Sequence, residues 1–196
     1  MNMKKGLIIT VAVIAAIVLW MATGYNGLVN AEESVTGQWA NVETQYQRRA
    51  DLIPNLVNTV KGYTTHERET LEGVIAARSK ATQITIDPQN MSPEKMKEYM
   101  EAQNQVGSAL SRLIAVSERY PDLKANQNFL ELQSQLEGTE NRIQVARKDY
   151  NDIVKIYNAK VRRFPKNIIA GIFNFEKKVY FEADEGSKSA PAVSFD

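Results

Sequence analysis

The sequence predicts an all-α protein in which an N-terminal transmembrane helix continues into an elongated antiparallel bundle of three to four helices. An apolar run from Gly6 to Thr23 contains no charged residue, and beyond it apolar residues recur at steps of three and four. That spacing is typical of helices that pack along a seam, whereas strand-like alternation of useful length is not found. The chain therefore divides into a short basic N-terminus (1–5), an anchor (6–25), a helical bundle (26–183) and a flexible polar tail (184–196).

The apolar run has the length and flanks of an uncleaved membrane anchor. At about 1.5 Å per residue it nearly crosses a hydrocarbon core of about 30 Å, and Trp20 and Tyr25 occupy an end where interfacial aromatics are expected. A cleaved signal peptide is the alternative, but no clear A-x-A site follows the run. Lys4 and Lys5 precede it, and the first charges after it are acidic. The positive-inside rule then predicts a cytoplasmic N-terminus and a bundle outside the bacterial inner membrane, in the periplasm if the cell is Gram-negative.

The first helix of the bundle is predicted to continue directly from the anchor. Its seam runs from Leu28 to Val60, and no strong breaker other than two glycines separates it from the membrane span. Two alternatives follow. The chain turns near Gly62 and forms four helices, or the first helix is continuous to Ile84 and the bundle has three long helices.

The later helices have clearer boundaries. A loop is predicted at Thr85–Met91, and the following Ser92-Pro93-Glu94 has the form of an N-cap, a first-turn proline and a first-turn acid. A third helix then extends from Met96 to Ile114 and a fourth from Phe129 to Phe164. The aromatic-rich segment from Phe164 to Ala183 is predicted to be a strap over one end of the bundle, short-helical at most.

Basic residues gather where the fourth helix ends. If the chain turns near Gly62, this end of the helix returns to the membrane and its cations face lipid headgroups. If the first helix is continuous, the same cations lie far from the membrane. The cluster is a candidate lipid or partner surface, and its members are Lys155, Lys160, Arg162, Arg163 and Lys166.

Catalytic, cofactor-binding and metal-binding residues are not expected. The chain has no cysteine and one histidine, and His66 begins an H-E-x-x-H pattern that fails because Thr70 stands at its last position. No phosphate-binding glycine loop and no G-x-S-x-G motif occurs. A net charge of +1 gives no indication of nucleic acid binding. The sequence therefore predicts a protein that is not an enzyme and uses no cofactor.

The stretch QRRADLIPNLV, from Gln47 to Val57, places a proline inside the first helix of the bundle. Pro54 cannot donate an N–H to the Ala50 carbonyl, so a helix interior here is kinked and destabilised by about 3 kcal/mol. Alternatively, the helix restarts with Asp51 as its N-cap. Both interpretations make the stretch a structural joint, and the competing functional interpretation is a docking notch for a partner.

Charged residues surround this proline. Arg48 and Asp51 are three apart on a helix and can pair, while Arg49 falls on or beside the apolar seam. An arginine on the seam needs a partner, for which Asp149 or Asp152 of the fourth helix are candidates. The residues proposed for the joint or for an interaction are Arg48, Arg49, Asp51 and Pro54.

Several motifs resemble the LemA family. The family's signature is similar to the segment from Tyr25 to Tyr63, YNGLVNAEESVTGQWANVETQYQRRADLIPNLVNTVKGY, and the match continues through HERETLEGVIAARSKA, YNDIVKIYNAKVRRFP and the YFEA that ends at Ala183. The resemblance implies a bacterial membrane protein with one N-terminal anchor and an elongated helical bundle. It carries over no catalytic residue, because none is established for the family. Relatives are associated with membrane-compartment formation in magnetotactic bacteria and with envelope proteases.

These features predict a single-pass scaffold or adaptor that acts through protein–protein contacts and homo-oligomerisation at the bacterial cell membrane. The expected partners are the lipid bilayer through residues 6–25, further copies of the chain, and an envelope protease or another membrane protein. Two alternatives stay open. One is a membrane-shaping or anionic-lipid-surface module, and the other is a ligand-sensing ectodomain that works with a partner signalling protein.

Overall fold

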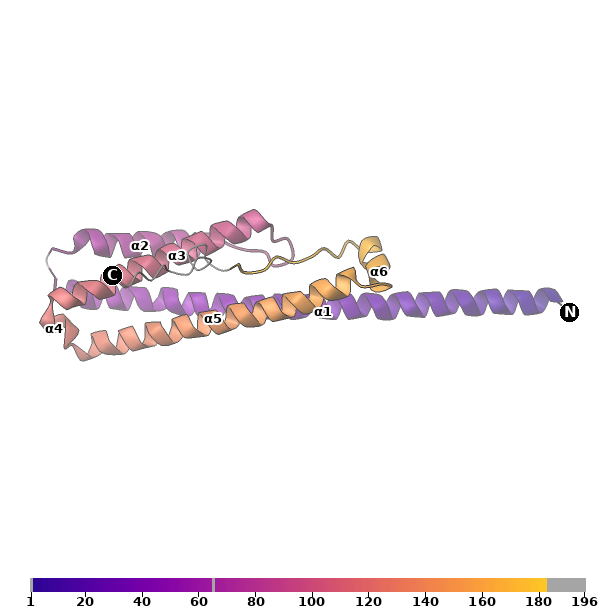
Figure 1. The fold of residues 1–196 in the computed structure, drawn as a ribbon, viewed down its shortest axis with the longest axis horizontal. Coiled ribbons are helices and arrows are strands. Elements are labelled where there is room, and N and C mark those ends of the chain that lie inside the picture. The colour runs from indigo at the N-terminus through magenta and orange to yellow at the C-terminus, as the bar shows by residue number, and fades with distance from the viewer. Residues whose placement is uncertain (1, 65, 183–196) are drawn as a thin grey trace, which may run out of the picture.

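The structure is an all-α rod from which one helix projects (Figure 1). The computed structural model describes residues 2–64 and 66–182, and these residues form helices and loops without a strand. The tail expected at 184–196 lies outside the described residues. The helices are α1 (Asn2–Lys61), α2 (Arg68–Gln83), α3 (Pro93–Val116), a 3-10 turn (Ser117–Arg119), α4 (Pro121–Lys124), α5 (Gln127–Arg162) and α6 (Lys166–Ile172).

α1 joins the anchor to the bundle without a break. It is one helix of 60 residues, and its side chains from Lys5 to Trp20 are all exposed. From Leu28 onward the helix is amphipathic, with Leu28, Val35 and Trp39 almost fully buried. Within the described residues, α1 is the one helix long and apolar enough to cross a membrane. The predicted continuation of the anchor into the bundle is therefore confirmed.

The chain turns at Gly62, which decides between the two alternatives that the sequence left open: the bundle has four long helices, and the first helix is not continuous to Ile84. α1 ends at Lys61, and the N–H of Gly62 donates to the carbonyl of Thr59 at 3.2 Å. α2 then begins at Arg68 and runs back along α1.

Contacts of Glu67 with two residues that follow α3 hold the chain at this turn. The carboxylate of Glu67 is buried and accepts hydrogen bonds from the Arg119 guanidinium at 3.1 Å and from the Tyr120 hydroxyl at 3.2 Å. A buried carboxylate needs such partners, so these contacts hold Glu67 at the corner. Thr64 does not cap α2 with its side chain, because its hydroxyl donates to the Val60 carbonyl at 3.1 Å.

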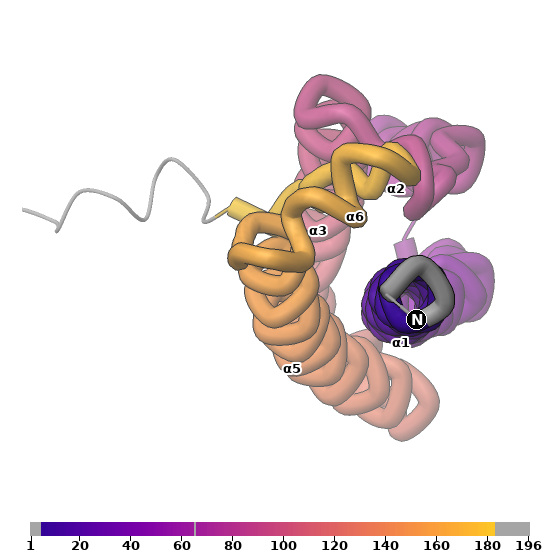
Figure 2. Tube along the Cα trace, turned by 90° about the vertical axis from the view of Figure 1, so that its right-hand side faces the viewer, coloured from indigo at the N-terminus to yellow at the C-terminus, as the bar shows by residue number. Residues whose placement is uncertain are grey.

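The four long helices run out, back, out and back along the rod. Seen along its axis, α2 and α3 lie on one side of α1 and α5 (Figure 2). The predicted N-cap is confirmed: the Ser92 hydroxyl accepts from the Lys95 N–H at 3.2 Å, and Pro93 opens α3. Asn126 caps α5 in the same way by accepting from Phe129 at 3.0 Å. Since α5 returns along α1, its last turn lies at the end of the bundle from which the anchor leaves.

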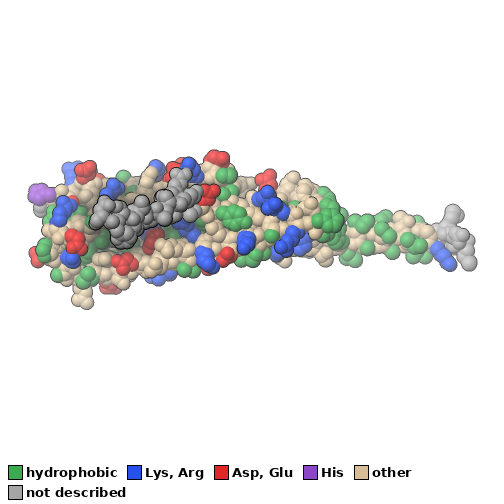
Figure 3. All heavy atoms as spheres, in the orientation of Figure 1, with side chains coloured by type: hydrophobic (Ala, Val, Ile, Leu, Met, Phe, Trp, Pro, Cys, Tyr) green, Lys and Arg blue, Asp and Glu red, His purple; other side chains and the backbone are tan. Residues whose placement is uncertain are grey.

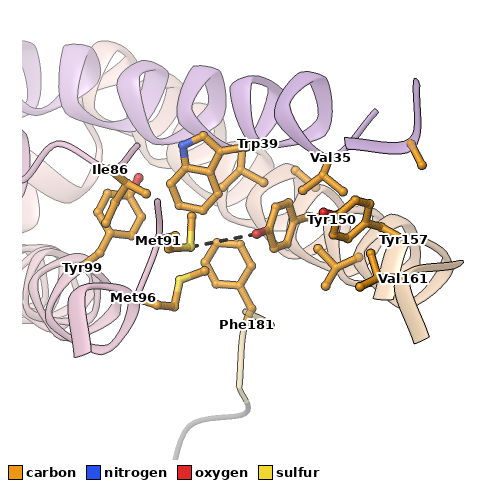
Figure 4. Packing of buried hydrophobic residues seen from close by; sticks show 14 of the residues in the cluster. Val35, Trp39, Ile86, Met91, Met96, Tyr99, Tyr150, Tyr157, Val161 and Phe181 are labelled. Atoms are coloured by element: carbon orange, nitrogen blue, oxygen red, sulfur yellow. Dashed lines mark hydrogen bonds between the residues drawn. The ribbon is translucent and has the colours of Figure 1, made fainter. Parts of the chain in front are cut away.

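The core consists of two buried clusters along the rod. The cluster nearer the anchor is aromatic, with Trp39 in contact with Tyr99, Tyr150 and Phe181 at ring-centroid distances of 5.4, 5.5 and 5.7 Å (Figure 4). The cluster at the far end is mainly aliphatic. The large aromatic area buried there stabilises the end of the bundle nearer the anchor.

Two asparagines of α5 hold the segment after α6, residues 175–182, in an extended conformation; we call this segment the strap. The side-chain amide of Asn158 donates to the Lys178 carbonyl and accepts from its N–H, both at 2.9 Å. Asn151 forms the same pair with Phe181, again at 2.9 Å. Seven residues of helix rise about 10.5 Å and three extended residues span about 10 Å, so the two spacings match.

Candidate functional site

Pro54 lies inside an uninterrupted helix, because α1 runs on to Lys61. A local restart with Asp51 as N-cap is therefore wrong. The Ala50 carbonyl, which has no donor at Pro54, instead accepts a hydrogen bond from Nε of Arg78 at 2.7 Å. Arg78 belongs to α2, so the position is a joint between two helices and not between two parts of one helix. The helix does not need to restart at Asp51, because the hydrogen bond from Arg78 satisfies the Ala50 carbonyl that Pro54 leaves without a donor.

Arg49 is the buried charge of the joint. Its side chain is 5% exposed, and it donates to Glu140 Oε2 at 3.0 Å, to the Gln103 carbonyl at 3.0 Å and to Gln103 Oε1 at 2.6 Å. The guanidinium also lies 5.1 Å from the centre of the Tyr46 ring. Arg49 thus joins α1 to both α3 and α5 through planar, directional contacts that a lysine would not reproduce.

The predicted carboxylate partner lies on the correct helix, but Asp149 and Asp152 are wrong. Trp39 of α1 packs against Tyr150 of α5, and this contact sets the register of the two antiparallel helices. Arg49 lies ten residues after Trp39, so it faces the residue ten positions before Tyr150. That residue is Glu140. Spacing within one sequence cannot reveal this register, which depends on how the aromatic side chains of two helices fit together.

Arg48 and Asp51 remain on the surface, and Asp51 accepts from the Gln47 side chain at 2.7 Å rather than from Arg48. Arg48 lines a groove of about 950 Å³ together with Glu43, Arg78 and Tyr99. The groove carries both signs of charge at its rim. Its geometry supports non-covalent contact with a polar partner.

The predicted basic cluster lies at the anchor end of the bundle. Lys155, Arg162 and Arg163 are exposed, and Lys160 and Lys166 are half-buried. None of the five forms an ion pair with another residue in the part of the chain that the structure describes. Lys166 of this cluster lies beside Gly27 of α1, and a Cβ at Gly27 would be in ordinary contact with Nζ at 3.8 Å.

α6 packs against α1 at the last residues of the anchor segment, a contact that the sequence did not predict. Ile169 is fully buried and fits against Gly24, where a Cβ would overlap Ile169 Cδ1. The ring of Tyr25 meets those of Phe173 and Phe175 at centroid distances of 4.8 and 5.7 Å. The small residue at position 24 therefore serves close packing between α1 and α6.

Lys178 of the strap forms a buried ion pair that no pattern in the sequence predicts. Its side chain is 6% exposed, and Nζ lies 2.7 Å from Glu32 Oε1 of α1. Nζ also donates to the Gln89 carbonyl at 3.0 Å and lies 5.8 Å from the centre of the Tyr157 ring. One ammonium group thus joins the strap, α1 and the loop before α3.

The features described above are surfaces and contacts between helices. Within residues 2–64 and 66–182, no group of three or more acidic, histidine or cysteine side chains is placed to hold a metal ion. A long helix that can span a membrane and a rod-shaped bundle built on it define a helical-bundle protein with a candidate membrane anchor.

Comparison with known proteins assigns the family. The sequence pattern that defines the LemA family matches residues 38–195, so the chain belongs to the LemA family. Protein LemA of Metamycoplasma hominis is 26% identical over 160 residues, which cover 82% of this chain and 69% of that protein.

Two similar proteins come from magnetotactic bacteria. Magnetosome protein MamQ 2 of Paramagnetospirillum magneticum is 27% identical over 196 residues, covering 90% of this chain and 71% of that protein. Magnetosome protein MamQ of Magnetospirillum gryphiswaldense is 24% identical over 192 residues, covering 89% and 71% respectively. Both alignments cover about nine tenths of the chain.

Proposed function

We propose that the protein is a single-pass scaffold or adaptor whose bundle binds other proteins, including further copies of itself, at the bacterial cell membrane. The observation that carries the proposal is α1, which is at once the candidate membrane span and a wall of the bundle. Whatever binds the bundle is thereby held at a fixed distance from the membrane. In this proposal residues 6–25 cross the inner membrane, the N-terminus is cytoplasmic and the bundle is extracytoplasmic.

The α1–α5 face supports the homo-oligomer part of the proposal. Val145 of α5 is 59% exposed and borders a groove of about 430 Å³ between the two helices. Gln45 in this groove has a buried side-chain oxygen that accepts no hydrogen bond from the residues that the structure describes. Arg142 and Asp149 lie along the same groove, so two copies related by a two-fold axis can pair opposite charges. Most residues that line the groove are polar, so the proposed contact between copies is a polar one with Val145 at its edge.

In-cell crosslinking of the anchored, full-length protein tests this proposal. The chain has no cysteine, so Val145→Cys gives a unique thiol, and Ile75→Cys, 51% exposed on α2, is the matched control. A bismaleimide crosslinker should produce covalent dimers with Val145→Cys and few with Ile75→Cys. Mass spectrometry of the crosslinked material identifies partners such as an envelope protease or another membrane protein. A protein that stays monomeric and captures nothing in either variant contradicts the proposal.

Topology is tested with the same cysteine-free chain. A membrane-impermeant maleimide applied to intact spheroplasts should label Ile75→Cys, and Asn2→Cys should react only after the cells are opened. The opposite pattern contradicts the proposed orientation without affecting the scaffold proposal.

An anionic-lipid or membrane-shaping role is a second candidate function, favoured by the turn at Gly62. That turn returns the basic cluster to the anchor end, where Arg162 and Arg163 form no ion pair with any residue that the structure describes. Full-length protein in phosphatidylglycerol vesicles should alter vesicle shape at low salt, and high salt or Arg162→Gln with Arg163→Gln should remove the effect. Lys61→Gln at the far end of the rod is the control. Unchanged vesicles at low salt exclude this role.

A further inference from the structure

α6 has apolar residues on both of its faces. Ile169 and Ala170 are buried against the bundle. On the outside, Ile168 and Ile172 stand one turn apart and are 47% and 58% exposed. A helix in contact with water on one side normally places polar residues there. The outer face of α6 is therefore suited to a second apolar environment.

The aromatic residues at the two ends of α6 enlarge this face. Phe164, just before the helix, is 81% exposed, and Phe173, just after it, is 43% exposed. We call Phe164, Ile168, Ile172 and Phe173 the apolar patch. Apolar side chains gather at the end of the bundle from which the anchor leaves, with basic side chains beside them (Figure 3).

The contacts of α6 with α1 fix the height of the apolar patch relative to the membrane. α6 touches α1 at Gly24 and Tyr25, which close the segment 6–25. About 20 helical residues cross a hydrocarbon core of about 30 Å, so these two residues lie where the core gives way to headgroups. Trp20 and Tyr25, each 38% exposed, are aromatics of the kind found at that boundary.

The charges around the apolar patch match an anionic lipid surface. Three basic residues near the patch are exposed and one is half-buried: Arg162, Arg163, Lys177 and, half-buried, Lys166. Between residues 162 and 177 the one acidic residue is Glu176, which is exposed. Helices that lie in a membrane interface combine an apolar face with flanking lysine and arginine in this way. A protein partner could cover the apolar residues, but it would have to fit between the bundle and the bilayer.

We infer that α6 is a membrane-interface helix. Phe164, Ile168, Ile172 and Phe173 insert at the boundary between headgroups and acyl chains of the leaflet next to the bundle, and Arg162, Arg163 and Lys166 contact lipid phosphates. The bundle then has a second attachment beside its anchor. A single spanning helix leaves rotation about its axis free, whereas two attachments fix which face of the rod meets partners. The inference rests on the proposed membrane span and is independent of the partners and of the oligomeric state.

Site-directed labelling of the full chain in lipid nanodiscs tests the inference. Ile168→Cys carries an environment-sensitive nitrobenzoxadiazole label in discs of phosphatidylcholine with phosphatidylglycerol. Leu130→Cys, 49% exposed near the far end of α5, is the control for water, and Val13→Cys in the anchor is the control for lipid. Lipids with a nitroxide on the acyl chain should quench the Ile168→Cys label several-fold more than the Leu130→Cys label. Its emission should also be shifted to the blue.

Each other outcome has a distinct meaning. If the Val13→Cys label is quenched and the Ile168→Cys label behaves as at Leu130→Cys, the interface helix is refuted while the anchor stands. A blue-shifted Ile168→Cys label that nitroxide lipids do not quench refutes it in favour of a protein that covers the patch. If the Ile168→Cys label is quenched in discs with phosphatidylglycerol but not in pure phosphatidylcholine discs, the contact with lipid depends on charge alone. That result overturns the insertion of the apolar patch. A Val13→Cys label that is not quenched refutes the membrane span itself, and the inference with it.

Discussion

The Nε atom of Arg78 donates a 2.7 Å hydrogen bond to the carbonyl of Ala50, the backbone group that Pro54 leaves without a helical donor. Ala50 is buried, so water cannot take the place of this donor easily. Pro54 thus leaves a backbone carbonyl of α1 free to accept a hydrogen bond, and Arg78 of α2 donates it. We interpret the pair as a built joint that fixes how α2 lies against α1.

Removal of the Arg78 donor should destabilise the protein more when Pro54 is present than when Pro54 is replaced. We expect Arg78→Met to lower the free energy of unfolding by about 1–3 kcal/mol, the usual effect of leaving a buried polar group unpaired. Pro54→Ala restores the helical N–H, so the Arg78→Met effect should shrink in that background. A double-mutant cycle from urea unfolding of the full-length protein in detergent measures the coupling. Equal effects of Arg78→Met in both backgrounds would contradict the joint.

Pro54→Ala also separates folding from function. The substitution should stabilise α1 by about 1–3 kcal/mol, because an interior proline costs about 3 kcal/mol and Arg78 offsets part of that cost. If the stabilised variant no longer gives crosslinks through Val145→Cys, the proline serves partner binding. If crosslinks persist, its role is confined to the packing of α2 on α1.

The two partners of Arg49 should contribute unequally. Glu140 is 47% exposed, so Glu140→Gln should lower the free energy of unfolding by less than about 1 kcal/mol. Gln103 is buried and supplies an acceptor at 2.6 Å, so Gln103→Leu should lower it by about 2–3 kcal/mol. Thermal unfolding followed by circular dichroism compares the two variants. The reverse order would show that the ion pair, rather than the buried amide, holds the arginine.

Local patterns in the sequence were sufficient for the helices but not for their contacts. The apolar run, the seam spacing and the Ser92 cap identified α1 and α3, because these signals act within one or two turns. The turn at Gly62 could not be decided, since it depends on the contact of Glu67 with residues at the end of α3. A strap over one end of the bundle was expected for the segment from Phe164 to Ala183. The hydrogen bonds that hold residues 175–182 to Asn151 and Asn158 were not expected, because they join two segments that meet only after folding.

The aromatic cluster should make the protein sensitive to alkaline pH. Burial raises the pKa of Tyr150 above its ordinary value of about 10. The unfolded chain therefore loses this proton at lower pH than the folded protein, and stability falls as the pH rises above about 10. We expect Tyr150→Phe to reduce the slope of stability against pH between about pH 10 and pH 12. At neutral pH the variant should be less stable by about 1 kcal/mol, because the hydroxyl donates to the Val179 carbonyl at 3.2 Å.

The contact of α6 with the anchor depends on a glycine. Gly24→Val should displace Ile169 and release α6, because even a Cβ at this position overlaps the Ile169 side chain. Amide hydrogen exchange of residues 166–172 should then rise several-fold while the rest of the bundle stays protected. Gly37→Ala is the matched control, since a Cβ there meets nothing within 4 Å. It should stabilise α1 by about 1 kcal/mol. Unchanged exchange in Gly24→Val would show that α6 does not depend on this contact.

Asn158 should be needed for both directions of its pairing with the strap. Asn158→Asp can still accept from the Lys178 N–H but cannot donate to its carbonyl, whereas Asn158→Ala can do neither. Exchange of the amides in residues 175–182 should therefore increase in the order wild type, Asn158→Asp, Asn158→Ala, with losses of about 1 and 2 kcal/mol in local stability. Asn141→Ala, exposed on the same helix, should leave that exchange unchanged. Equal protection in Asn158→Asp and wild type would mean that the carbonyl bond adds nothing and that Phe181 packing holds the strap.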